Sequence, residues 1–350
     1  MDEESNRAGD EENRITYSIE TRGKLIAGLI IVAGVSFSWV GASQFTENTY
    51  TKSFNSPSFM MWFSTSWMSL SYLPAVILSF FQRKRLIDTY RNDAMIFGTN
   101  GVCPRSLFKI VLPFCLIWCV TNYCYTRALG KVAVTDVTAM FASCNAFVYV
   151  FSLLILKEQF MLLRVMSVIL SISGVVVMAY ADGFKGPSLE GVLLSMSAAV
   201  GAAFYKVMFK RVFGDISVNR VALFLSLLGI VNFLVLWPPF EILYFTHEES
   251  INWSNIPWGF LCGRSILSLV FNFLINFGIA YTFPLFISLG TILGIPINGI
   301  VDSVYRNKTF SGLKIGASFL IVGGFLLMLL PSNVFDRFKS KNPEKVNLIT

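Results

Sequence analysis

Long apolar runs follow one another along most of this chain, and short polar segments separate them. A helix needs about 20 apolar residues to cross the hydrocarbon core of a bilayer. Ten runs approach that length, near residues 25–45, 58–81, 110–126, 133–155, 162–180, 191–209, 221–240, 258–280, 284–302 and 313–331. Strands of a membrane barrel span only about 10 residues and alternate in polarity. The pattern therefore predicts an all-α integral membrane protein with ten transmembrane helices.

Composition indicates the same environment. Of the 350 residues, 54% are hydrophobic and 14% are charged, whereas soluble domains carry about 25% charged residues. All six cysteines except Cys103 fall in or at the edge of a predicted helix. No disulfide framework is therefore expected.

The distribution of basic residues predicts the orientation of the helices. With a cytoplasmic N-terminus, the inner segments hold 18 of the 28 lysines and arginines, and the outer loops hold seven. Cytoplasmic loops of membrane proteins carry such an excess of positive charge, so we expect both termini to be cytoplasmic. The same distribution accounts for the net charge of +7 without a nucleic-acid partner. The sequons at Asn252 and Asn307 fall in predicted outer loops, which agrees with this orientation.

The ten helices divide into two sets of five, in residues 21–186 and 187–335. An acidic tail at 1–20, which lacks the basic start of a signal peptide, is expected to be disordered and cytoplasmic, and a basic cytoplasmic tail follows at 336–350. An odd number of helices per set requires the second set to insert inverted. A shift of 150 residues pairs Asn122 with Asn272, Phe160 with Phe310, Gly174 with Gly324 and Met178 with Met328. We interpret these matches as an inverted repeat, an architecture in which secondary transporters bind substrate near the membrane midplane.

Several longer motifs carry a family resemblance. They are SPSFMMWFSTSW (56–67), TNY (121–123), TDVTAMFASCNAFV (135–148), YADGF (180–184), YKVMFK (205–210), IPWGFLCG (256–263) and NFGIAYTFP (276–284). With Lys157 and Glu158 closing the fourth helix, they resemble the drug/metabolite transporter superfamily over residues 25–335 and, within it, solute carrier family 35, subfamily F. The resemblance implies transport of a small solute, and this branch is associated with thiamine. The second repeat has Asn307 and Lys308 in place of Lys157 and Glu158, so the acidic helix end is not duplicated.

Asp136 is the principal candidate among the ionisable residues. It lies about one turn inside the outer end of the fourth helix, and ionisable groups at such positions usually face a bundle interior or a wet cavity. Two interpretations stay open: an ion pair with Arg264, at similar depth in the eighth helix, or a carboxylate that attracts a cationic solute or a proton. Asp302, at the outer end of the ninth helix, is expected to be solvated. Lys206 lies near the cytoplasmic surface, where its long side chain can reach water.

Neutral polar and aromatic residues lie deeper in the predicted helices. Asn122 and Tyr125 share a face of the third helix, whereas Asn145 lies near the middle of the fourth, half a turn out of phase with Asp136. Amides offer hydrogen bonds to a heterocycle, and an aromatic ring can hold a cation. The other candidates of this kind are Trp62 and Asn276. Hydrogen bonds between helices are the competing role for each asparagine.

Together these residues favour a transporter over an enzyme. The single histidine is His247, and the sequence has no HExxH, Walker or nucleophile-elbow motif. We predict a secondary-active transporter that works by alternating access, with a thiamine-like cationic vitamin as solute. The alternatives are a nucleotide-sugar or nucleobase-type solute, whose phosphate would meet Lys206 or Arg264, and a membrane scaffold or sensor that transports nothing. No cofactor or metal is expected. The predicted partners are the lipid bilayer and a small solute; the coupling proton or ion, the membrane and the oligomeric state stay open.

Overall fold

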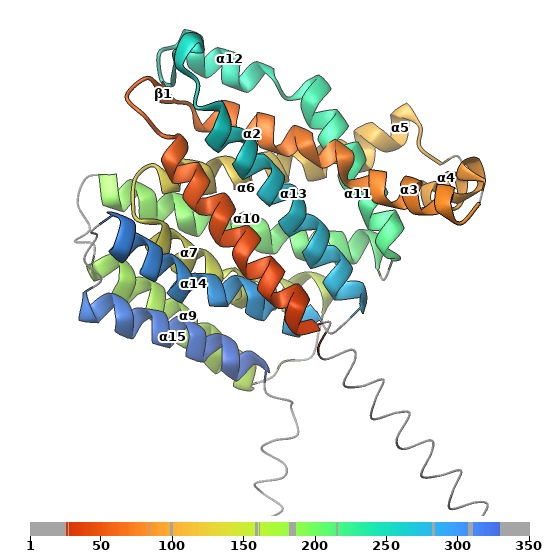
Figure 1. The fold of residues 1–350 in the computed structure, drawn as a ribbon. Coiled ribbons are helices and arrows are strands. Elements are labelled where there is room, and N and C mark those ends of the chain that lie inside the picture. The colour runs from red at the N-terminus through yellow and green to blue at the C-terminus, as the bar shows by residue number, and fades with distance from the viewer. Residues whose placement is uncertain are drawn as a thin grey trace, which may run out of the picture. The chain divides into compact units, whose positions relative to one another are not determined.

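The computed structural model describes residues 26, 28–83, 85–98, 101–157, 160, 162–181, 187–214, 216–281, 284–306 and 311–329. The described chain is mostly helical, with one short pair of strands (Figure 1). Both predicted tails, Glu158 and the sequon at Asn307 lie outside the described residues, as does the side chain of Asn276.

Six described helices are long and apolar enough to cross a membrane. They are Gly28–Thr49, Pro104–Leu129, Val134–Leu156, Leu189–Phe213, Val218–Phe245 and Trp258–Ile275. Each coincides with a predicted run, so the all-α membrane class is confirmed. The remaining runs are helical in α2 (Pro57–Ser66), η1 (Trp67–Tyr72), α3 (Leu73–Phe81), α9 (Leu162–Ala181), α14 (Pro284–Arg306) and α15 (Gly312–Leu329). Ten membrane crossings in two inverted repeats stay a proposal for this chain.

The chain forms two compact units, and each draws on both halves of the sequence. Unit 1 comprises Met1–Cys115 and Ile216–Ile297, and unit 2 comprises Leu116–Asp215 and Asn298–Thr350. In unit 1 lie Gly28–Thr49, β1 (Phe54–Asn55), α2, η1, α3, α4 (Leu86–Ala94), η2 (Met95–Phe97), α5 (Pro104–Ser106), η3 (Leu107–Val111), α11 (Val218–Val235), α12 (Pro238–Phe245), β2 (Ser250–Ile251), η5 (Trp253–Asn255) and α13 (Trp258–Tyr281). In unit 2 lie α7 (Val134–Ala142), α8 (Cys144–Phe151), η4 (Ser152–Leu156), α9, α10 (Pro187–Phe213) and α15, while α6 (Leu112–Leu129) and α14 begin in unit 1 and end in unit 2.

In unit 1, the second apolar run changes from an α-helix to the 3₁₀-helix η1 and back. Pro74 has no N–H to donate to the carbonyl of Leu70, which instead accepts from Leu73 in the 3₁₀ pattern. Helix α11 packs closely along this run, since a Cβ at Gly229 would lie 2.3 Å from the backbone nitrogen of Ser69. Asn232 of α11 also donates to the carbonyl of Trp62 at 2.9 Å. Side chains of α11 thus satisfy backbone groups of the irregular helix.

The strands β1 and β2 join two loops of unit 1. They pair antiparallel, with Phe54 opposite Ile251. Beneath them lies a buried apolar cluster formed by Phe54, Phe59, Met60, Phe240, Ile251, Ile256 and Leu261. This cluster fixes the beginning of α2 against the segment that contains Glu249.

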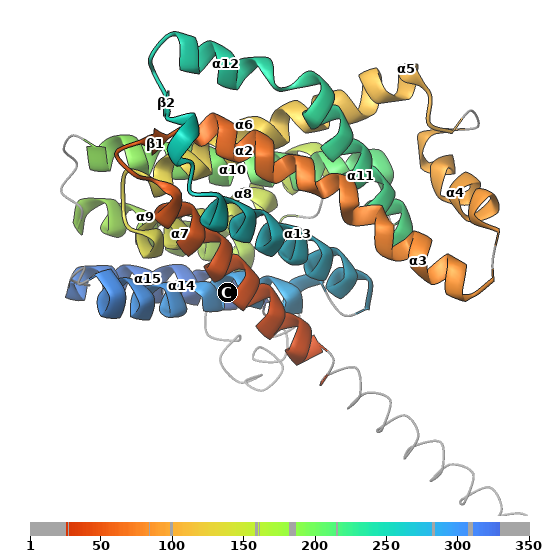
Figure 2. The same cartoon turned by 45° about the horizontal axis from the view of Figure 1, so that its top comes forward.

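In unit 2, α9 and α15 pack side by side and antiparallel (Figures 1 and 2). A Cβ at Gly174 would lie 2.9 Å from the carbonyl oxygen of Ala317. Farther along, Ser167 Oγ donates to the carbonyl of Gly324 at 2.6 Å. Small residues therefore allow the two backbones to approach, as is usual where burial against lipid gives no driving force.

The fourth apolar run is interrupted at Ser143, between α7 and α8. Ser143 Oγ donates to the carbonyl of Met140 at 2.6 Å. The backbone of Ser143 is itself right-handed helical, so Val134–Leu156 forms one span and the expected half-turn offset between Asp136 and Asn145 stays a prediction.

Candidate functional site

The site is built around the first turn of α7 in unit 2. The first amides of a helix have no partner within the helix, and the residue at the N-cap of α7 is Ala133, whose side chain has no oxygen to accept from them. Polar residues follow it at Thr135, Asp136 and Thr138, all at most 2% exposed. These side chains receive contacts from the far end of the chain, in α14 and α15.

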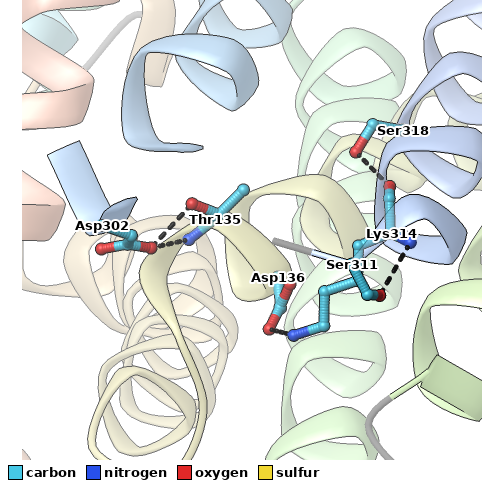
Figure 3. A network of polar contacts seen from close by, with 6 residues as sticks. All are labelled: Thr135, Asp136, Asp302, Ser311, Lys314 and Ser318. Carbon is cyan, nitrogen blue, oxygen red and sulfur yellow. Dashed lines mark hydrogen bonds and ion pairs between the residues drawn. The ribbon is translucent and has the colours of Figure 1, made fainter. Parts of the chain in front are cut away.

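Asp302 of α14 supplies the missing cap. One of its carboxylate oxygens accepts from Thr135 N–H at 2.9 Å and from Thr135 Oγ1 at 2.7 Å (Figure 3). Asp302 is 2% exposed, so the expectation that it would be solvated is wrong. The reason is that α14 continues to Arg306, which places Asp302 inside the helix rather than at its end.

Asp136 forms a buried ion pair with Lys314. The Asp136 Oδ2 to Lys314 Nζ distance is 2.5 Å, and the two side chains are 2% and 13% exposed (Figure 3). Sequence analysis counted Lys314 with the outer loops, but it belongs to α15, where Ser311 Oγ accepts from its backbone N–H at 3.4 Å. Arg264 belongs to unit 1, so a contact between Arg264 and Asp136 stays a prediction.

A third contact ties α14 to the same turn. Asn298 Nδ2 donates to Thr138 Oγ1 at 3.0 Å, and Asn298 is fully buried. Thr135 therefore contacts Asp302, Asp136 contacts Lys314, and Thr138 contacts Asn298. Sequence analysis missed Asn298 and Lys314, although the spacing of Asn298 and Asp302, four apart on one helix face, is a usable signal.

Five of the predicted site residues lie in unit 2. Besides Asp136, these are Asn122, Tyr125, Asn145 and Lys206. Asn122 donates to the carbonyl of Trp118 in its own helix at 2.8 Å, Tyr125 is 8% exposed with its ring 5.0 Å from that of Phe141, and Asn145 is half-buried. The exposed Lys206 reaches Cys144 Sγ at 3.7 Å.

The other three predicted residues lie in unit 1. The Trp62 ring stacks on Phe233 at 5.6 Å, and its indole nitrogen is buried with no hydrogen-bond partner within the described part of the chain. Arg264 is 7% exposed. Asn276 lies in α13, with its side chain outside the described residues. Among the eight predicted residues, Asp136 forms the buried ion pair described above.

The long apolar helices define the class of the protein as a multi-pass membrane protein. No protein-family model matches the chain. Solute carrier family 35 member F3 from Mus musculus is 39% identical over 90% of this chain and 76% of that protein. Member F3 from Homo sapiens is also 39% identical, over 88% of this chain and 74% of that protein. The chain belongs to solute carrier family 35, subfamily F, which confirms the resemblance in its sequence.

Two further comparisons agree. Member F4 from Mus musculus is 41% identical over 88% of this chain and 64% of that longer protein. A solved crystal structure of another protein covers 89% of this chain and 99% of its own, with a TM-score of 0.57 and 16% identity. At that identity the likeness concerns the fold alone. The relatives are solute carriers, which supports a transporter rather than an enzyme.

Proposed function

We propose that this protein is a secondary-active transporter that moves a thiamine-like organic cation by alternating access. The observation that carries the proposal is the Asp136 carboxylate, which accepts a primary ammonium group at 2.5 Å inside unit 2. A carboxylate at the beginning of a helix is stabilised by the helix dipole. The negative charge of this carboxylate, and not the helix end itself, suits the positive charge of a solute.

We include ten membrane crossings in two inverted repeats in this proposal. The fifth and tenth predicted helices correspond to α9 and α15, and an odd number of helices per repeat requires them to run in opposite directions. The contacts of Ser167 with Gly324 and of Gly174 with Ala317 show that α9 and α15 are antiparallel, which agrees with the inverted repeat. The matched Asn122 and Asn272 also each donate to the carbonyl four residues earlier at 2.8 Å.

The second candidate is a transporter of a nucleotide sugar or nucleobase. It is favoured by Lys206, an exposed residue of unit 2 whose ammonium group lies 3.7 Å from Cys144 Sγ and could offer a charge to a phosphate. A scaffold or sensor is the remaining alternative, and it would show no saturable flux.

Uptake into proteoliposomes tests these candidates. The purified full chain is reconstituted and given labelled thiamine, nucleotide sugars and nucleobases in turn. Saturable uptake of thiamine, competed by unlabelled thiamine, supports the proposal. Uptake of a nucleotide sugar with none of thiamine contradicts the cationic solute but keeps the transporter, and absence of flux for every compound favours the scaffold. Asp88→Asn, which alters an exposed carboxylate of α4, is the matched control for changes at Asp136.

A further inference from the structure

The helix dipole acts differently on the two partners of the Asp136–Lys314 ion pair. Asp136 lies in the first turn of α7, where the positive end of the helix dipole stabilises its charge. Lys314 lies in the first turn of α15, where the same end of the dipole opposes an ammonium group. The ion pair with Asp136 therefore stabilises Lys314 in the first turn of α15, where the helix dipole is unfavourable for an ammonium group.

Their exposure and length are also unequal. The Asp136 side chain is 2% exposed and short, whereas the Lys314 side chain is 13% exposed and carries a flexible four-carbon stem. Of the two charged groups, the ammonium group of Lys314 is therefore the one that we expect to move away from the pair.

The first turn of α7 is held in place by contacts that do not involve Lys314. Asp302 accepts from Thr135 twice, and Asn298 donates to Thr138. Asp302, the other described acid at this turn, already accepts from neutral donors. If Lys314 leaves, these α14 contacts keep the Asp136 carboxylate at its position for another cation.

We propose that Lys314 is a tethered counter-ion which a cationic solute displaces from Asp136. This inference rests on the proposed function and specifies why the site would select organic cations. Removing the ammonium group from a buried carboxylate is costly unless another positive charge takes its place. A neutral or anionic solute brings no positive charge to replace the ammonium group of Lys314, so the pair selects organic cations.

The proposal predicts the sign of a change at Lys314. A solute that competes with Lys314 for Asp136 has an apparent Kd equal to its intrinsic Kd divided by the fraction of protein in which Lys314 is not bound to Asp136. If Lys314 occupies the carboxylate about 90% of the time, its removal lowers the apparent Kd about 10-fold. A lysine with a purely structural role predicts weaker or unchanged binding on removal.

Equilibrium binding of thiamine to the full chain in nanodiscs provides the first test. We expect Lys314→Gln to bind thiamine about 10-fold more tightly than the unaltered protein. Lys109→Gln, which changes an exposed lysine of η3, should leave the Kd unchanged. Unchanged or weaker binding by a folded Lys314→Gln protein overturns the proposal.

A second test uses the unaltered protein, so it does not depend on whether Lys314→Gln folds. Acetic anhydride modifies free amines, and mass spectrometry measures the modified fraction of Lys314 with and without saturating thiamine. Displacement predicts faster acetylation of Lys314 when thiamine is bound, with Lys109 unaffected. Equal or slower acetylation with thiamine bound overturns the proposal.

The two proposals fail in different ways. If thiamine is transported but neither the Kd of Lys314→Gln nor the acetylation of Lys314 changes as expected, displacement is wrong and the cationic transporter stands. If neither the unaltered protein nor Lys314→Gln binds thiamine, displacement by thiamine falls together with the cationic solute. Uptake of a nucleotide sugar would then still support a transporter.

Discussion

Two helices, α2 in unit 1 and α7 in unit 2, each begin at a carboxylate from a distant part of the chain. At α2, Glu249 accepts from Ser56 Oγ at 2.5 Å, from Ser58 N–H at 3.2 Å and from Ser58 Oγ. At α7, Asp302 accepts from the backbone and side chain of Thr135. In both places a buried acid satisfies the free amides of a helix start through neutral donors.

The difference between the two regions is the second acid of α7. The α2 start has one buried acid among the described residues, Glu249, which is 4% exposed and accepts from Ser56 and Ser58. The Ser56 side chain also accepts from Phe59 N–H at 3.4 Å. The α7 start has Asp302 as its cap and also Asp136, which forms an ion pair with Lys314. Because one acid suffices to begin a buried helix, capping alone does not explain Asp136. Glu249 and Asp302 therefore serve as caps of their helices, and the transport role of Asp136 stays a proposal.

The largest effect is expected for Asp136→Asn. The amide keeps the shape but removes the charge, and a hydrogen bond to a charged group is worth about 1.5–3 kcal/mol. Uptake of thiamine should fall about 10-fold or more, since each factor of 10 corresponds to about 1.4 kcal/mol. Protein yield and membrane insertion should stay near normal. Uptake rates in proteoliposomes, with Asp88→Asn as control, check this.

The ion-pair interpretation makes a different prediction for the same residue. If Asp136 serves mainly to neutralise Arg264, then Asp136→Asn with Arg264→Gln should recover both folding and transport. If Asp136→Asn alone transports thiamine at the normal rate and affinity, its role in attracting solute is wrong. Asn122, Tyr125 and Asn145 then become the better candidates.

Glu249→Ala should reduce stability rather than solute affinity. It leaves the buried donors of Ser56 and Ser58 without their acceptor, which costs about 1–3 kcal/mol for an unsatisfied group. We expect a lower midpoint of thermal unfolding in detergent and an unchanged thiamine Kd in the fraction that folds. A large change of Kd at an unchanged unfolding midpoint would reverse the roles that the comparison assigns.

The fold class could be predicted from the sequence because apolar runs are a local signal. The choice of Asp136 as a candidate also follows from the sequence, since a short charged side chain inside such a run is costly. Its partner was not, because Lys314 is 178 residues away and lies at the edge of an apolar run, where it resembles a loop residue. Asp302 was misplaced because the apolar run ends there while α14 continues to Arg306. The interruption at Ser143 has no proline or glycine to mark it.

Asp302→Asn should have a smaller effect than either change above. The amide oxygen can still accept from Thr135 N–H and Oγ1, so the cap is weakened and not lost. We expect a loss of about 0.5–1 kcal/mol in stability, near the lower range for cap substitutions, and thiamine uptake close to normal. Uptake as low as that of Asp136→Asn would show that the two acids of α7 act together.

The smallest effect is expected for cysteine labelling, which causes no loss of function. It tests which side of the membrane the beginnings of α2 and α7 face. The positive-inside distribution predicts that the beginnings of α2 and α7 lie at the outer side and Cys103 at the cytoplasmic side. Hydrogen bonds from Ser106 lower the pKa of the Cys103 thiol from its ordinary value. A lowered pKa raises the thiolate fraction at neutral pH, and the thiolate is the reactive form. Cys103 is also partly exposed, so it should react first with a maleimide.

An impermeant maleimide should therefore label Cys103 in inside-out vesicles and not in intact cells, provided that the protein reaches the plasma membrane. Cys103→Ser should remove the fast labelling and leave thiamine uptake unchanged. Epitope tags at Met1 and Thr350 supply an independent measurement, because both ends are predicted to be cytoplasmic. Opposite exposure of the two tags would exclude an even number of crossings and with it the ten-helix proposal. Labelling of Cys103 from outside would invert the orientation, and Asp136 would then face the cytoplasmic side.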